Sequence, residues 1–386
     1  MKTSNHLLRR LTAALLAAVL ALSIALPVFA SDDGDTIYIN SVSDLLSLAR
    51  NCAYDQWSVG KTVILQKDLS LEGMLWEPIP SFSGQFKGNG HTISDLTITG
   101  QYSPAGLFGI VEEQGSIESL SVRGVVSVSD SADTTTGGIV GVNHGTLINC
   151  QFTGVVTGDS EVGGIVGRNE SEGTIDHSTA RAIVTGKSST GGIAGYNLGA
   201  ITGCTNVGSI NTEYPEASLD TDGFTAKMVD YINNKMAAAA DDATNSVTNV
   251  ATDTGGIAGR SSGMILTSVN TGTIGYEHVG YNVGGIVGHT DGLVSGCVNQ
   301  GHILGRKDVG GIAGQAEPYR ELDLSKDTIK RLRSELEVLR GLVDDTTGVV
   351  ENSTTSISNS FSAMTSQMDT AIAAARQLDD QASDYG

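Results

Sequence analysis

The stretch Gly163-Gly164-Ile165-Val166-Gly167 decides the fold, because close copies of it recur along the chain. Each copy holds a pair of small residues, then an aliphatic residue, a variable residue and a glycine. The second residue of the pair is always glycine, at Gly106, Gly138, Gly164, Gly192, Gly256, Gly285 and Gly311. Most steps are about 28 residues, and the long step after Gly192 contains one repeat plus an insertion. A period of this size indicates a stacked repeat protein.

The same alignment brings aliphatic residues to three fixed places in the unit. Directly after the glycine pair come Leu107, Ile139, Ile165, Ile193, Ile257, Ile286 and Ile312. The second place holds Ile117, Leu147, Ile175, Ile201, Ile265 and Val294, and the third holds Val126, Val156, Val184, Ile210, Ile274 and Ile303. Short, mostly β-branched stretches bounded by glycine or asparagine predict three short strands per turn.

Stacking each unit on the previous one would place like residues about 4.8 Å apart on parallel strands. We therefore predict an all-β, right-handed parallel β-helix over roughly residues 36 to 318, on the order of 35 to 40 Å tall. Residues 31–104 would form an N-terminal cap and the first strands, and residues 105–318 the repeats. A β-propeller is the alternative, but its blades need about 40 to 50 residues each.

Cysteines share one place in the unit with serines. Cys150, Cys204 and Cys297 alternate there with Ser178 and Ser268. Cysteines two turns apart would be separated by about 9.6 Å, beyond the roughly 7 Å limit between the Cα atoms of a disulfide. We therefore interpret them as small buried thiols, and we expect no metal site and no cofactor.

Asparagines occupy another place, five residues after the glycine pair. Asn143, Asn169 and Asn197 stand there, followed by Ser261 and Thr290 in later units. Side-chain amides at a turn bond to neighbouring backbone groups, so we expect a structural ladder.

The first thirty residues have the features of a secretory signal peptide. Lys2, Arg9 and Arg10 precede an uncharged apolar stretch, and Val28-Phe29-Ala30 offers small residues for cleavage. The chain carries 23 basic against 43 acidic residues, a net charge of -20. Such a charge opposes binding to nucleic acids or anionic lipids. We expect a secreted or cell-surface protein without a membrane span in the mature chain.

Three segments depart from the repeat. Residues 41–50 have the pattern of a short amphipathic helix after a polar N-cap, suited to cover the first turn. An insertion at about 212–254 contains a helical pattern from Phe224 to Ala237. It is either a tolerated excursion or a binding element. Residues 319–386 carry apolar residues at coiled-coil spacing, which predicts self-association through residues 325–375.

The run from Trp76 to Ile93, then Ala105-Gly106-Leu107-Phe108-Gly109 and the later Gly-Gly-Ile units, resembles the GLUG-repeat proteins. These are secreted or surface proteins, mostly of Gram-positive bacteria, and the repeat also occurs upstream of IgA-peptidase-type zinc peptidase domains. The resemblance covers roughly residues 36 to 318. It implies a surface scaffold with an adhesin-like role and supplies no catalytic residues.

An extracellular enzyme acting on polysaccharide or peptide, or a non-catalytic part of one, is the competing class. A zinc peptidase of that kind needs two histidines four residues apart with a glutamate between them, and the sequence has no such motif. Acidic residues precede the glycine pair at Asp159, Glu161, Asp253 and Asp308. We expect these to be solvated surface residues that form no catalytic carboxylate pair, and we predict no catalytic residues.

The residue four after the glycine pair defines the candidate ligand-binding site. Successive units place Val142, Arg168, Tyr196, Arg260, His289 and Gln315 there. If the aliphatic residue and the last glycine of the motif point inward, strand alternation turns the second and fourth residues after the glycine pair outward. Arg168, Tyr196, Arg260 and His289 would then form a strip suited to an anionic glycan or an acidic peptide, whether of a host or a bacterial surface. The alternative is that they are ordinary exposed strand residues.

Overall fold

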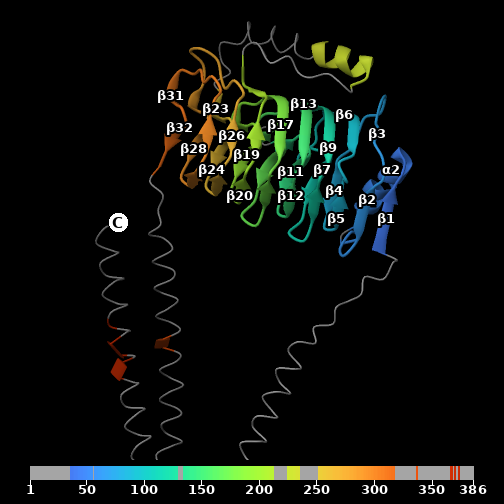
Figure 1. Cartoon of the computed structure of the whole chain (residues 1–386), viewed down its shortest axis with the longest axis horizontal. Helices are drawn as coiled ribbons and strands as arrows, with labels where there is room; N and C mark the ends of the chain where they lie inside the picture. The colour runs from blue at the N-terminus through green and yellow to red at the C-terminus, as the bar shows by residue number, and fades with distance from the viewer. Residues whose placement is uncertain are drawn as a thin grey trace, which may run out of the picture. The chain divides into compact units, whose positions relative to one another are not determined.

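A computed structural model describes residues 35–54, 56–128, 134–212, 224–234 and 251–317, with isolated positions between 336 and 373. The described residues between 35 and 317 form a parallel β-solenoid of about nine turns (Figure 1). Within the described residues its strands form four parallel sheets, which we call A, B, C and D. The predicted signal peptide and nearly all of residues 319–386 lie outside the described residues.

Sheets A and B supply two sides of the solenoid. Sheet A contains β1 (Thr36–Ile39), β2 (Thr62–Leu65), β5 (Gln85–Lys87), β8 (Ser116–Glu118), β12 (Thr146–Ile148), β16 (Thr174–Asp176), β20 (Ala200–Thr202), β25 (Met264–Leu266) and β29 (Leu293–Ser295). Sheet B contains β3 (Leu69–Ser70), β6 (Thr92–Gly100), β9 (Ser121–Val128), β13 (Gln151–Thr157), β17 (Thr179–Thr185), β21 (Thr205–Asn206), β26 (Val269–Asn270) and β30 (Val298–Asn299), with β22 (Ser209–Ile210) also paired to β17.

Sheets C and D lie on either side of the glycine pair. Sheet C contains β4 (Ile79–Phe82), β7 (Phe108–Val111), β11 (Val140–Asn143), β15 (Val166–Asn169), β19 (Ala194–Asn197), β24 (Ala258–Ser261), β28 (Val287–Thr290) and β32 (Ala313–Ala316). Sheet D contains β10 (Thr136–Gly137), β14 (Val162–Gly163), β18 (Ser188–Gly191), β23 (Thr252–Gly255), β27 (Tyr281–Gly284) and β31 (Lys307–Gly310).

The prediction of three strands per turn was wrong by one strand. Sheet D is the fourth, and each of its strands ends on the first glycine of the motif. Strands of two to four residues that end on glycine contain no aliphatic run, so the sequence carried no strand signal for them.

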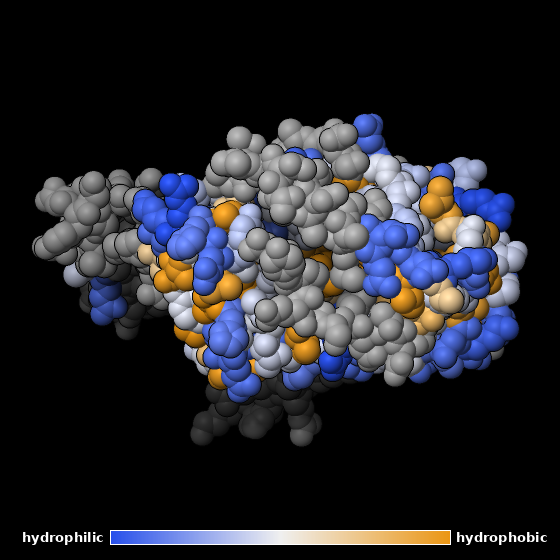
Figure 2. All heavy atoms as spheres, turned by 90° about the horizontal axis from the view of Figure 1, so that it is seen from above, coloured by the Kyte–Doolittle hydropathy of each residue, from blue (hydrophilic) through white to orange (hydrophobic). Residues whose placement is uncertain are grey.

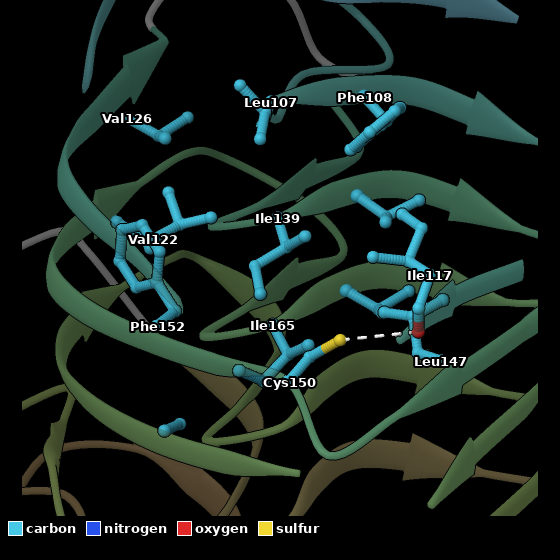
Figure 3. Packing of buried hydrophobic residues seen from close by; sticks show 14 of the residues in the cluster. Leu107, Phe108, Ile117, Val122, Val126, Ile139, Leu147, Cys150, Phe152 and Ile165 are labelled. Atoms are coloured by element: carbon cyan, nitrogen blue, oxygen red, sulfur yellow. Dashed lines mark hydrogen bonds between the residues drawn. The ribbon is translucent and has the colours of Figure 1, made fainter. Parts of the chain in front are cut away.

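The second and third aliphatic columns are confirmed by the strand register, and backbone hydrogen bonds from Ile139 to Ile165 and from Ile165 to Ile193 confirm the first. Leu147 pairs with Ile117 on one side and Ile175 on the other, and Val156 lies between Val126 and Val184 in the same way. Figure 3 shows Leu107, Ile139 and Ile165 stacked in one column on successive turns. These side chains are buried and belong to one continuous core. In the last turn that the structure describes, Ile312 is 42% exposed.

Side-chain direction beside the motif differs from the expected alternation. The residue after the aliphatic one, such as Val140 or Val166, was predicted to face outward but is fully buried. The reason is that Ile139 lies in a bend between β10 and β11, so the regular alternation of β11 does not include it. The fourth residue, such as Arg168, is partly exposed as predicted.

The three glycines of the motif are required by close contacts. A Cβ atom on Gly137 would lie 2.7 Å from the amide nitrogen of Gly167 in the next turn. A Cβ on Gly138 would overlap the Phe152 ring, and one on Gly141 would meet Pro104 at 2.5 Å. Since no larger residue fits any of these places, the motif marks the corner where backbone and side chains approach most closely.

The predicted asparagine ladder forms in the buried corner after sheet C. The Asn143 Nδ2 donates to Asn169 Oδ1 at 2.8 Å, and Asn169 donates to Asn197 in the same way. Asn197 continues to Ser261 Oγ at 3.0 Å. These bonds satisfy amides that are fully removed from solvent, as buried polar groups require.

A second ladder was not predicted. The Asn206 Nδ2 donates to Asn270 Oδ1 at 2.8 Å, and Asn270 donates to Asn299 at 2.7 Å. Earlier turns place Phe152 and Ala180 in this column of sheet B. The change from apolar to polar residues within one column hid the ladder in the sequence.

The helix α2 (Val42–Asn51) forms where the amphipathic pattern placed it. The Ser41 hydroxyl accepts a hydrogen bond from the Asp44 amide at 3.3 Å, which stabilises the first turn of the helix. Leu45 and Leu48 are buried in the main core. No helix in the described part of the chain is long and apolar enough to cross a membrane. On the face seen in Figure 2, hydrophobic residues form separate small groups between hydrophilic ones.

We expect Gly138→Ala to lower the free energy of unfolding by about 1 to 3 kcal/mol or more, because the new methyl group would overlap Phe152. Gly311→Ala is the matched control, since it occupies the same place in the motif but would have nothing within 4 Å. Urea unfolding of both variants checks this. Both substitutions lower the conformational entropy of the unfolded chain by the same amount, so this contribution cancels in the comparison. Equal effects of the two substitutions would therefore contradict the packing explanation.

Candidate functional site

The four residues predicted to bind a ligand come together on sheet C. Strand register places Arg168 beside Tyr196, Tyr196 beside Arg260, and Arg260 beside His289. Each comes from its own strand, β15, β19, β24 and β28, and each side chain is partly exposed. Neighbouring members are therefore about 4.8 Å apart at the backbone. We call these four residues the sheet C strip.

Arg168 is neutralised by two carboxylates. Its Nη1 lies 2.7 Å from Glu161 Oε1, and its Nε lies 2.8 Å from Glu170 Oε1. Glu161 also accepts a hydrogen bond from the Thr135 hydroxyl at 3.2 Å. With both acids mostly covered, these bonds hold the guanidinium in place and leave little net positive charge at this end of the strip.

Tyr196 lies between two guanidinium groups. The Arg168 Cζ is 5.1 Å from the centre of the Tyr196 ring, and the Arg260 Cζ is 5.6 Å from it. These distances are in the range of cation–π attraction. The Tyr196 hydroxyl also lies 3.3 Å from the Ser262 hydroxyl, so the ring is fixed at its tip as well.

Arg260 differs from Arg168 in lacking a carboxylate partner among the described residues. The Nε atoms of both arginines are buried and make no hydrogen bond within the part of the chain that the structure describes, but that of Arg168 has an ion-pair contact with Glu170. Asp253 stands seven residues before Arg260, as Glu161 stands before Arg168. However, Asp253 Oδ1 accepts a hydrogen bond from Asn282 Nδ2 at 2.7 Å and lies 4.0 Å from His289 Nδ1.

The acids before the glycine pair were expected to be solvated, and for three of them this was wrong. The side chain of Asp159 is 16% exposed and pairs with Lys187, that of Glu161 is 19% exposed, and that of Asp253 is 14% exposed. Stacking brings the turn before the glycine pair against the strip, so these acids reach cations of the same or the next turn. The seven-residue spacing was a signal for the pair of Glu161 with Arg168, but not for Asp159 or Asp253, whose partners lie in the next turn.

A polar depression lies away from the sheet C strip. Lys87, Asn89, Glu118, Ser119 and Asn149 line an open depression of about 380 Å³ where sheets A and B meet. Asn89, Ser119 and Asn149 adopt the left-handed backbone conformation there, which a corner of this kind requires. Among the described residues no group of three or more His, Cys, Asp or Glu side chains is arranged to hold a metal ion.

Two of the cysteines in the thiol column, Cys150 and Cys204, are buried and unreactive near pH 7. The Ser178 hydroxyl accepts a hydrogen bond from the Cys150 amide at 3.1 Å, and the Ser178 amide donates to the Cys204 sulfur at 3.4 Å. The Cys150 thiol in turn lies 3.4 Å from the Ile117 carbonyl oxygen (Figure 3). Burial raises the pKa of Cys150 and of Cys204 to about 12, so both remain neutral thiols near pH 7. Cys150 and Cys204 are buried free thiols as predicted, whereas Cys297 is only half-buried.

Two relatives resemble parts of the chain, and no family model matches it. Halomucin of Haloquadratum walsbyi is 31% identical over 155 residues, which is 37% of this chain and 2% of halomucin. A protein described as a Gly-rich membrane protein of Evansella cellulosilytica is 29% identical over 137 residues, 26% of this chain and 16% of that protein. The chain thus spans a small part of the length of either relative.

A solved structure with a related outline is described as an immunoglobulin A1 protease from Bacteroides ovatus. The likeness covers 75% of this chain and 86% of that chain, with a TM-score of 0.49 and 18% identity.

Native thiol labelling at pH 8 should modify Cys297 first and Cys150 and Cys204 at least about tenfold more slowly, because a thiol reacts as its thiolate. Cys297 is half-buried, whereas the other two are buried and have pKa values of about 12. Mass spectrometry of the labelled peptides gives the rates, and Cys297→Ser should remove the fast phase. Equally fast labelling of Cys150 in the folded protein would contradict the buried-column assignment.

Proposed function

We propose that the chain is an exported, non-catalytic β-solenoid scaffold that binds an anionic group of an extracellular ligand through the sheet C strip. The observation that supports this most is Arg260, a guanidinium on the Tyr196 ring that has no carboxylate within salt-bridge distance among the described residues. A rigid parallel sheet holds the strip in register, so little ordering is needed when a ligand binds.

The members of the strip would have different roles. Arg168 is held by Glu161 and Glu170, so we assign it to positioning the Tyr196 ring. Arg260 and His289 would provide the contacts to a carboxylate or sulfate of a glycan, or to an acidic side chain of a surface protein. Since the chain as a whole is strongly acidic, a local site for anions must depend on such short-range contacts.

The cellular setting is part of the same proposal. The features of residues 1–30 support export, and the name of one relative, a membrane protein, fits a location at or beyond the membrane. We assign the repeat to the GLUG type of bacterial surface proteins, including those of Gram-positive species. We further propose that α2 closes the first turn, and that residues 325–375 associate with a second chain.

The competing proposal is catalysis on an extracellular polysaccharide or peptide. Glu161 and Glu170 are two carboxylates at the strip, and the same guanidinium holds both. A pair of catalytic carboxylates must reach a bound substrate from opposite sides, whereas these two carboxylates are both engaged with one arginine side chain. This arrangement favours a structural over a catalytic role.

The test is retention of the purified chain on immobilised uronate-containing and sulfated glycans and on acidic peptides. Arg260→Ala should weaken binding about 10- to 100-fold, the usual effect of losing a charge-assisted hydrogen bond. The matched control is Arg181→Ala on sheet B, which removes an exposed arginine from another face. Assaying the same mixtures for new reducing ends or cleaved peptides tests catalysis.

Unchanged binding in the Arg168→Ala/Arg260→Ala double variant would refute the strip as the binding site. Release of product that stops on substituting Glu161 or Glu170 with glutamine would replace the scaffold proposal with an enzymatic one.

A further inference from the structure

A second, smaller apolar cluster lies on the outer side of sheet B. Val125, Val155 and Ile183 are paired in register on β9, β13 and β17, next to inward-facing residues of the main core. They are buried although they point away from the interior. The same column continues with Thr97 before them and Ser209 after them, so the apolar part is limited to three turns.

The helix of the insertion covers this apolar strip. The helix spans residues 226–234, and its Met228 and Ile232 are buried against the three aliphatic residues. Phe224 and Tyr231 pack at its edges. Figure 1 shows this helix over β6, although β23, which follows it in the sequence, lies several turns away.

A buried carboxylate fixes the start of the helix. Asp95 lies at an irregular position of β6, with left-handed backbone geometry (φ 59°), and its side chain is almost fully buried. It accepts hydrogen bonds from the Ser70 hydroxyl at 2.7 Å, the Ser94 hydroxyl at 2.9 Å, and both the amide and the hydroxyl of Thr225 at 3.2 and 2.9 Å.

The local geometry around Thr225 is that of a helix N-cap. Its hydroxyl oxygen accepts a hydrogen bond from the Met228 amide at 3.3 Å. The negative charge of Asp95 therefore lies at the positive end of the helix dipole, where it is stabilising. An exposed pair between Lys227 and Glu72, at 3.1 Å, adds little.

We propose that residues 224–234 act as a clasp that makes the turns from β6 to β17 open and close together. In a solenoid each turn otherwise contacts only its neighbours, so the turns can lose structure one at a time. The clasp contacts β6, β9, β13 and β17 at once while being covalently joined to the chain between β22 and β23. Opening any of these turns alone would break the contacts of the whole helix.

Native-state hydrogen exchange tests the clasp in the full-length protein. In Ile232→Asp, amides of β6, β9, β13 and β17 should exchange at least about tenfold faster by a common factor, while those of β25 and β28 remain unchanged. Asn233→Asp is the matched control, because it adds the same charge on the exposed side of the same helix. We expect each variant to keep its strands, because Ile232 lies outside the main core. Circular dichroism checks this.

The two anchors must also act as one unit. Asp95→Asn should accelerate hydrogen exchange in the same strands. Combining it with Ile232→Asp should increase the exchange rates little further, because either change already opens the clasp. Faster exchange confined to the helix itself, with unchanged strands, would overturn the proposal. Fully additive effects of the two substitutions would overturn it as well.

Discussion

The close approach of successive turns at the glycine motif is the constraint on which the structure depends. Gly137, Gly138 and Gly141 leave no room for a Cβ, because the next turn, the Phe152 ring and Pro104 occupy that space. Once this corner closes, the backbone of each turn is held in register with the last. The aliphatic columns, the asparagine ladders and the thiol column all follow from that register, since each needs like residues to meet at one strand spacing.

The period of the repeat predicted most of the fold, including which individual residues stack on one another. Leu147, Val156 and Asn169 lie against the partners that alignment of the repeats assigns to them. What failed was local geometry within the unit. Sheet D has strands too short to leave a hydrophobic pattern, and the bend at Ile139 turns Val140 inward although simple alternation would expose it. A repeat alignment fixes which residues stack, but it does not fix where the chain bends.

Interactions between different columns were harder to foresee than those within one. The strip from Arg168 to His289 could be placed from spacing alone, but its pairing with Glu161 and Glu170 depends on how two sheets meet at a corner. The outer cluster of Val125 with Ile232 was missed for the same reason. In Val125-Val126 one side chain serves the core and the other the helix, and the sequence does not distinguish them. Asp95 gave no signal either, because its partner Thr225 is 130 residues away.

The asparagine ladders point in one direction along the solenoid. In both, the Nδ2 of one turn donates to the oxygen of the turn that follows, as from Asn143 to Asn169 and from Asn206 to Asn270. A turn without its successor would leave this amide N–H at an open end of the stack, with water as its remaining partner. The next asparagine supplies the missing acceptor. On a chain synthesised from its N terminus, each finished turn would therefore present a donor for the turn that follows and serve as a template for it.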